Sequence, residues 1–168
     1  MHTVHPWVRV SSFALSFIRV FNEHCLKEKD FFLLFLILRG EDMSRSDKAV
    51  EYKHSGSNCA QAVLLACRDA VDFDDETLKR LGAAFAVGMG NMEATCGALI
   101  AAQIIHGLVN FRGYPIIRDT KEIADVFKIR CGSLKCAALK GIETGTVLCP
   151  CDDCIRNAID ILEESGII

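Results

Sequence analysis

The chain has 168 residues, which is enough for one domain whose hydrophobic core needs no disulfide bonds to hold it. Its net charge is −3, so it offers no broad basic face, and we expect no nucleic-acid partner. Nine cysteines are far more than packing requires. Because that number is odd and no convincing export signal is present, we expect a cytoplasmic protein that uses its thiols for redox chemistry or metal binding.

Residues 1–42 differ in character from the rest of the chain. Their two apolar runs, WVRVSSFALSFIRVF and FFLLFLIL, both fall short of the roughly 20 residues that span a bilayer. No signal-peptide cleavage site follows them. We interpret residues 1–42, with Cys25, as an N-terminal extension outside the domain and expect translation to start at Met43; two added helices or a membrane-surface anchor are the alternatives. A ribosome-binding site in the DNA just before Met43 would support the later start.

From Met43 onward the spacing of apolar residues predicts helices. The stretch SGSNCAQAVLLACRDAV places its apolar residues on one helical face, with Ser57 or Asn58 as the N-cap. The stretch DFDDETLKRLGAAFAVG predicts a second helix, which Asp74 caps. The residues expected to face the core from this second helix are Leu78, Leu81 and Phe85.

The glycine-rich GMGN then interrupts the chain, and an almost wholly apolar helix is predicted from about Met92 to Val109. We expect it to be the long central helix of the fold. RDTKEIADVFKI predicts the next helix, capped at Asp119 or the following residue and ended by Gly132. A short helix over 133–141 and a last helix from near Asp152 follow. No segment alternates as a strand does, so we predict an all-α fold, a single compact bundle of about five to six helices spanning residues 43–168.

Several cysteines lie near the predicted beginnings of four different helices. They are Cys59, Cys96, Cys136, Cys151 and Cys154. The free N–H groups and the dipole at a helix N-terminus stabilise negative charge, so a thiol there can lose its proton well below its ordinary pKa of about 8.5. The thiolate is both the nucleophile of disulfide exchange and the ligand of soft metals. We therefore predict that these five cysteines carry the chemistry.

The segment CPCDDC is the most specific local signal. Cys151 and Cys154 form a C-x-x-C pair, a spacing that suits redox couples and metal sites alike, and Cys149 adds a third thiol. No βαβ pattern surrounds the pair, which excludes a thioredoxin fold. The spacing of the cysteines between Cys131 and Cys154 matches neither a zinc ribbon nor a ferredoxin.

Three other residues are interpreted more plainly. Cys67 lies on an apolar stripe and is expected to be a core residue, because free cysteine packs as a small hydrophobe. Cys131 lies at a helix end, where neither a structural nor a functional role is favoured. His106 is expected to be a core histidine whose hydrogen bonds are satisfied.

With these residues in view, residues 43–168 resemble the redox-active protein family named for the cysteine pattern C_GCAxxG_C_C. The matching segments are SNCAQAVL with Cys59, GMGNMEATCGAL with Cys96, GSLKCAALKG with Cys136, and CDDCIRNAIDIL. The fourth family cysteine corresponds to Cys151 or Cys154. The glycine that closes the central family motif is Ala101 here, a change that affects packing more than chemistry. The resemblance implies a redox role without an established substrate, and gene neighbourhoods that often include transporters.

Three functional hypotheses follow. The first is a thiol-dependent oxidoreductase, in which Cys96 or Cys59 attacks an oxidised sulfur and a cysteine of the Cys151/Cys154 pair resolves the mixed disulfide. The second is a metal protein for electron transfer, in which the five helix-start cysteines hold an iron–sulfur cluster or zinc. The third is a helical partner module of a membrane transporter. The sequence identifies neither the redox partner nor the oligomeric state.

Overall fold

The computed structural model describes residues 43–168 of the chain. The α-helices of this part are α3 (Arg45–His54), α4 (Cys59–Ala66), α5 (Asp75–Gly82), α6 (Gly97–Asn110), α7 (Ile117–Cys131), α8 (Cys136–Leu139) and α9 (Cys151–Glu164). Two 3-10 turns, η1 (Arg68–Ala70) and η2 (Ala83–Phe85), follow α4 and α5. No β-strand occurs in this part of the chain, which confirms the predicted all-α class. The predictions for residues 1–42, including Cys25, lie outside the described residues.

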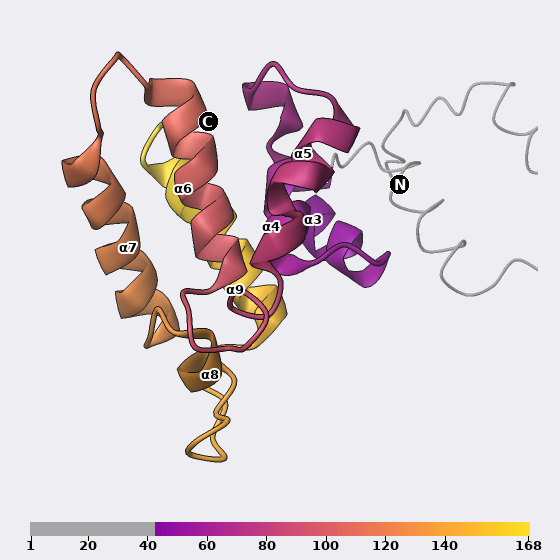
Figure 1. Ribbon diagram of the computed structural model, residues 1–168, viewed down its shortest axis with the longest axis vertical. Coiled ribbons are helices and arrows are strands. Elements are labelled where there is room, and N and C mark those ends of the chain that lie inside the picture. The colour runs from indigo at the N-terminus through magenta and orange to yellow at the C-terminus, as the bar shows by residue number, and fades with distance from the viewer. Residues whose placement is uncertain (1–42) are drawn as a thin grey trace, which may run out of the picture. The chain divides into compact units, whose positions relative to one another are not determined.

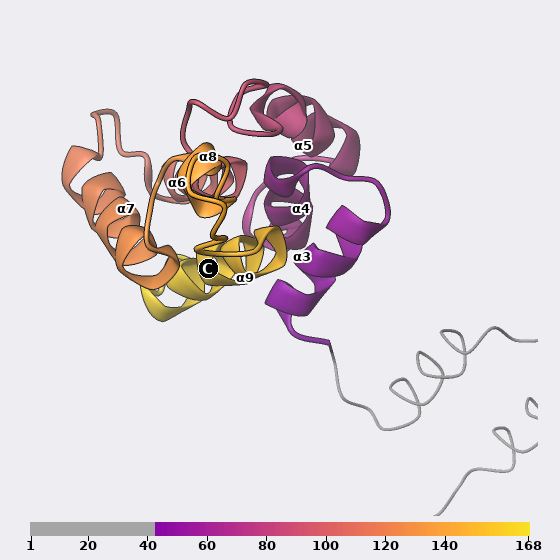
Figure 2. The ribbon, with the colours of Figure 1, turned by 90° about the horizontal axis from the view of Figure 1, so that it is seen from below.

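Helices α4 and α9 each pack against four other helices. Helix α4 contacts α3, α5, α6 and α9, and α9 contacts α3, α4, α6 and α7. In Figures 1 and 2, α7 lies on one side, α3 to α5 lie on the other, and α6 and α9 lie between them. The short helix α8 lies at the end of the bundle where α6 begins (Figure 1).

Helix α9 shows how the sequence pattern produces this packing. Pro150 precedes its first residue and cannot donate a backbone hydrogen bond, so the helix begins there at no cost. Its apolar residues recur at helical spacing, which buries one face against the neighbouring helices. The buried residues are Cys154, Ile155, Ala158, Ile159, Ile161 and Leu162. The predicted stripe of α5 is less regular, because Leu78 is fully buried whereas Leu81 is 39% exposed.

The helix predicted from Met92 to Val109 is shorter than expected. Helix α6 begins only at Gly97, because the preceding residues bond to a distant segment instead of to one another. The backbone N–H of Cys96 donates to the carbonyl of Leu134 at 2.8 Å, within an antiparallel bridge between Thr95 and Lys135. Met92 itself has a φ of 64°, which no right-handed helix allows. A long apolar central helix is therefore not formed.

Two further helices depart from the predicted pattern. Helix α3 was not predicted, and it buries only Ala49, so its sequence carries little apolar periodicity. Helix α8 extends over four residues only, because the backbone of its predicted first turn is used in the bridge to Thr95. No helix within residues 43–168 is long and apolar enough to cross a lipid bilayer.

Candidate functional site

All five cysteines singled out at predicted helix starts line one cavity of about 120 Å³. They reach it from the N-terminal ends of four helices, α4, α6, α8 and α9. Cys149, from the loop before α9, lines it as well. The remaining lining residues are Lys53, Ser57, Asn58, Ala86, Val87, Gly88, Gly97, Leu139 and Lys140. The folding of the bundle thus gathers six thiols from segments that are far apart in the sequence.

Helix capping positions two of these thiols. Asn58 forms a capping box with Gln61: its side chain accepts from the Gln61 backbone N–H at 2.9 Å, and the Gln61 side chain accepts from the Asn58 backbone N–H at 3.0 Å. Cys59 is therefore fixed as the first residue of α4. Cys151 is the first residue of α9, one position earlier than the predicted start at Asp152. These two are the half-buried cysteines of the described chain, whereas the others are buried.

The bridge between Thr95 and Lys135 positions the next two thiols. It lies directly before Cys96 on one side and Cys136 on the other. The N–H of Cys136 donates to the carbonyl of Ala94 at 3.0 Å, which completes the link between the two segments. A non-local backbone contact therefore holds these two cysteines beside each other.

The loop at the edge of the cavity has a strained backbone. Val87, Met89 and Met92 have φ values of 51°, 60° and 64°, a region that side-chain-bearing residues avoid. Such conformations cost on the order of 1–3 kcal/mol each and occur mostly at functional sites. Gly88, between them, lets the loop pass close to a thiol-bearing residue, because a Cβ there would lie 2.6 Å from the Cβ of Cys136. The strain thus coincides with the wall of the thiol cavity.

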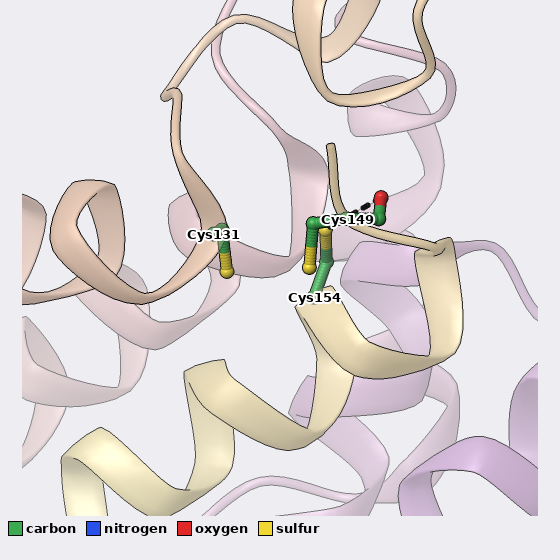
Figure 3. A group of neighbouring side chains, drawn as sticks. All are labelled: Cys131, Cys149 and Cys154. Atoms are coloured by element: carbon green, nitrogen blue, oxygen red, sulfur yellow. Dashed lines mark hydrogen bonds between the residues drawn. The ribbon is translucent and has the colours of Figure 1, made fainter. Parts of the chain in front are cut away.

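A second group of thiols, here called the inner thiol group, shares Cys149 and Cys154 with the lining of the cavity and adds Cys131. The sulfur atoms of Cys131, Cys149 and Cys154 lie within 4.8 Å of one another, and all three residues are buried. Figure 3 shows Cys131 at the end of α7, beside Cys149 from the loop before α9 and Cys154 from the first turn of α9. The Cys154 thiol donates to the Cys149 carbonyl at 3.6 Å. Three soft ligand atoms at this spacing suit a metal ion.

The half-buried pair at the cavity has opposite pKa shifts. Hydrogen bonding with Cys59 lowers the pKa of the Cys151 thiol to about 6, and the positive charges of Lys140 and Lys53 act in the same direction. The same hydrogen bond and burial raise the pKa of Cys59. Lys53 is held in place by Asp152, whose carboxylate it contacts at 2.7 Å. The arrangement favours a Cys151 thiolate that accepts a hydrogen bond from a Cys59 thiol.

The buried thiols also shift one another's pKa. Hydrogen bonding with Cys131 and Cys96 raises the pKa of Cys154, and hydrogen bonding with Cys154 lowers the pKa of both neighbours, that of Cys131 to about 7. The backbone N–H groups of Ala98 and Leu99, at the start of α6, also lower the pKa of Cys96.

A position at a helix start does not by itself lower the pKa of a thiol here, because three of the five cysteines have a raised pKa. Burial raises the pKa of Cys136, and thiol neighbours raise the pKa of Cys59 and Cys154. The dipole at a helix start is worth about 0.3–1 kcal/mol, up to about 2 where partly buried. Desolvation and the repulsion between neighbouring thiolates exceed that contribution here.

The cysteines outside the predicted set differ in role. Cys67 packs in the core, as predicted, and burial raises its pKa to about 12. Cys131 and Cys149 belong to the inner thiol group. The sequence favoured no role for Cys131, and Cys149 was not among the five cysteines predicted to carry the chemistry. Their spacing to Cys154 was the available signal, but it matched neither a zinc ribbon nor a ferredoxin. Only the fold shows that their sulfur atoms meet.

The fold and this site define an all-α, cysteine-rich protein whose thiols meet at the N-termini of four helices. The sequence model of the family described as "Putative redox-active protein (C_GCAxxG_C_C)" matches residues 57–165. The chain therefore belongs to this family. No curated protein and no solved structure matches the chain.

The pKa of Cys151 predicts how its reactivity depends on pH. Because this pKa is lowered to about 6, the thiolate forms above that pH, so the alkylation rate should rise through pH 6 and level off near neutrality. Replacing Lys140 with glutamine removes a positive charge that stabilises the thiolate, so the midpoint should move to higher pH. Labelling with iodoacetamide and peptide mass spectrometry measures both. Lys128→Gln, an exposed lysine on α7, is the matched control, and an equal shift in that variant would contradict the assignment.

Proposed function

We propose that the protein performs thiol–disulfide exchange, with Cys151 as the attacking thiolate and Cys59 as the resolving thiol. The observation that carries the proposal is the pairing of these two half-buried cysteines beside Lys53 and Lys140, at the edge of a cavity lined by thiols. Membership of a redox-active family supports it. The proposal assigns the chemistry to a domain formed by residues 43–168, with residues 1–42 as a separate extension.

These roles differ from the hypothesis drawn from the sequence, in which Cys96 or Cys59 is the thiol that attacks the oxidised sulfur. Cys96 is 5% exposed, so a disulfide substrate has little access to its sulfur. Cys59 is accessible but has a raised pKa, so it is protonated at neutral pH and suits the second step better. Cys151 combines access with a thiolate at neutral pH.

The reaction balances as follows. The Cys151 thiolate attacks one sulfur of a substrate disulfide, a mixed disulfide forms, and the other substrate sulfur leaves as a thiolate that takes up a proton. Cys59 then loses its proton and attacks the Cys151 sulfur, which releases the second substrate thiol. The substrate gains two electrons and two protons, and the protein is left with a Cys59–Cys151 disulfide. A dithiol reductant, as the redox partner, returns the protein to its free thiols, a state that suits the cytoplasm.

The inner thiol group favours a second function, metal binding. Cys131, Cys149 and Cys154 hold their sulfur atoms within 4.8 Å of one another, and Cys96 hydrogen-bonds with Cys154. Of the five cysteines predicted from sequence as ligands, only Cys154 belongs to the trio. Thiolates fit zinc and iron–sulfur clusters by their softness. Bound there, zinc supplies a structural cross-link and a cluster supplies an electron-carrying centre.

Counting free thiols tests the first function. Mild oxidation should remove two alkylatable thiols, peptide mapping should find them joined as Cys59–Cys151, and a dithiol should restore both. Identical thiol counts in the reduced and oxidised protein would overturn the proposal. Metal analysis of anaerobically purified protein tests the second function. Stoichiometric metal that disappears in Cys149→Ser but persists in Cys59→Ser would establish it, and metal-free, fully folded protein would remove it.

A further inference from the structure

A second cavity lies away from the thiols, between α6, α7 and the C-terminal end of the chain, with a volume of about 360 Å³. No cysteine is among its lining residues. Its lining combines an apolar part with a polar part. The apolar residues are Ile123, Val126, Ile161 and Ile167, and the polar residues are His106, Asn110, Asp119, Glu122 and Ser165.

His106 is the unusual member of this lining. It is 3% exposed, and its Nε2 atom has no hydrogen-bond partner within residues 43–168, which contradicts the predicted satisfied core histidine. A buried polar atom without a partner costs about 1–3 kcal/mol and in native proteins commonly marks a bound ion, a water or a functional site. A carboxylate oxygen of Asp119 lies 3.9 Å from this nitrogen, beyond hydrogen-bond distance. The nitrogen and the carboxylate therefore face the same space.

The other ring nitrogen of His106 is held by Asn110. Its Nδ1 atom lies 3.1 Å from the side-chain amide nitrogen of Asn110, which donates in this orientation. The oxygen and nitrogen of an amide group are nearly equal in size, so metal binding at Nε2 requires only that the amide turn over and present its oxygen to Nδ1. Nδ1 then carries the proton and donates it to Asn110, and Nε2 presents its lone pair to the cavity. Histidines that bind metals show this arrangement, with the second nitrogen donating to an oriented acceptor.

Two carboxylates of α7 line the same cavity as His106. Asp119 and Glu122 are three residues apart on α7, so both lie on the helix face that lines the cavity. Glu122 accepts from Arg118 at 3.3 Å, and both side chains of this pair are exposed. An exposed pair of this kind is worth about 0–1 kcal/mol, so it does not hold the carboxylate against a divalent cation.

We propose that His106 and Asp119, joined by Glu122 once its side chain turns away from Arg118, form a binding site for a divalent metal ion of the class that accepts nitrogen and oxygen ligands, such as Zn²⁺ or Mn²⁺. One imidazole nitrogen and two carboxylates leave a coordination position open to the cavity, which is the donor pattern of an accessible rather than a closed site. Asn110 acts as a positioning residue for the imidazole. The site is independent of the thiols and of the redox function proposed for them.

Mn²⁺ is the probe that separates this site from the thiols, because it prefers oxygen and nitrogen ligands to sulfur. The full chain is titrated with Mn²⁺ in reducing buffer, and electron paramagnetic resonance measures the free ion. We expect one bound equivalent. Loss of a residue that supports a metal ligand typically lowers metal affinity by about 10–100-fold, and loss of a ligand itself should cost at least as much. Asp119→Asn and His106→Gln should therefore each lower the Mn²⁺ affinity by about tenfold or more.

The matched control is Asp125→Asn, which makes the same change of charge on α7 at a residue that pairs with Lys121 and does not line the cavity. It should bind Mn²⁺ as the unchanged protein does, and so should Cys151→Ser. Asp119 is 58% exposed, so its variant folds even if the buried His106 variant does not, and thermal melting checks both. The proposal is overturned if no Mn²⁺ binds, if Asp119→Asn binds normally, or if Asp125→Asn weakens binding equally.

Discussion

Replacing Cys59 with serine is expected to trap Cys151 as a mixed disulfide with a small disulfide substrate. Without the resolving thiol the second exchange cannot occur, so turnover should fall on the order of 100-fold or more, as for other groups that take part in covalent steps. The serine hydroxyl still donates to Cys151, so the thiolate that attacks is preserved. Intact-protein mass spectrometry should show one added substrate thiol, and peptide mapping should place it on Cys151.

The complementary variants make this result specific. Cys151→Ser should form no adduct at all, because serine is not ionised at neutral pH. Cys67→Ala removes a core thiol that does not line the cavity and should keep full turnover, at a cost of about 1 kcal/mol or more in stability from the lost packing. Normal turnover of Cys59→Ser, or an adduct on Cys96, would show that the assigned roles are wrong.

Replacing Gly97 with alanine is expected to cause a large loss of stability. Gly97 is the first residue of α6, and a Cβ there would lie 2.3 Å from the carbonyl oxygen of Phe85. The contact is with backbone, so a side chain cannot simply rotate away, and overpacking of this kind costs about 1–3 kcal/mol or more. Denaturant unfolding measures the loss. The start of α6 must also shift, so Cys96 should alkylate faster in this variant.

Gly107 provides the control on the same helix. Apart from its chain neighbours and the backbone of its own helix, no heavy atom of residues 43–168 lies within 4 Å of the Cβ that alanine would add there. Glycine within a helix is less favourable than alanine by roughly 0.5–1 kcal/mol, so Gly107→Ala should stabilise the protein. The free energy of unfolding should therefore fall in Gly97→Ala and rise in Gly107→Ala, because only Gly97 lies where α6 closely approaches η2. Equal effects of the two substitutions would disprove the role of that approach.

Local sequence signals were reliable where a helix could be formed without help from distant segments. The apolar spacing of α9 predicts Ile155, Ala158, Ile159 and Leu162 on one face, and all four are buried. Asp74 caps α5 as predicted, accepting from the Thr77 backbone N–H at 2.7 Å. The capping box of Asn58 is likewise a local interaction. Such features depend on residues three or four positions apart, so the sequence alone contains them.

The start of α6 shows where this reasoning fails. Residues 92–96 were predicted to form the first turn of the helix, yet their backbone groups bond to the segment around Lys135. That competition between local and distant hydrogen bonds is invisible in a single stretch of sequence. Helix α3 was not predicted for a different reason: it has one buried residue, Ala49, so its sequence shows no periodic apolar pattern.

The sequence by itself determined the all-α class and the placement of thiols at the beginnings of helices, because both depend on spacing along the chain. Only the tertiary structure decided that Cys131 and Cys149 join Cys154, and which thiols ionise. A proton shared between two sulfur atoms settles on one of them according to the charges, donors and burial that surround both. For Cys151 those surroundings come from α3, α4 and the end of α8, segments that only folding brings to the start of α9.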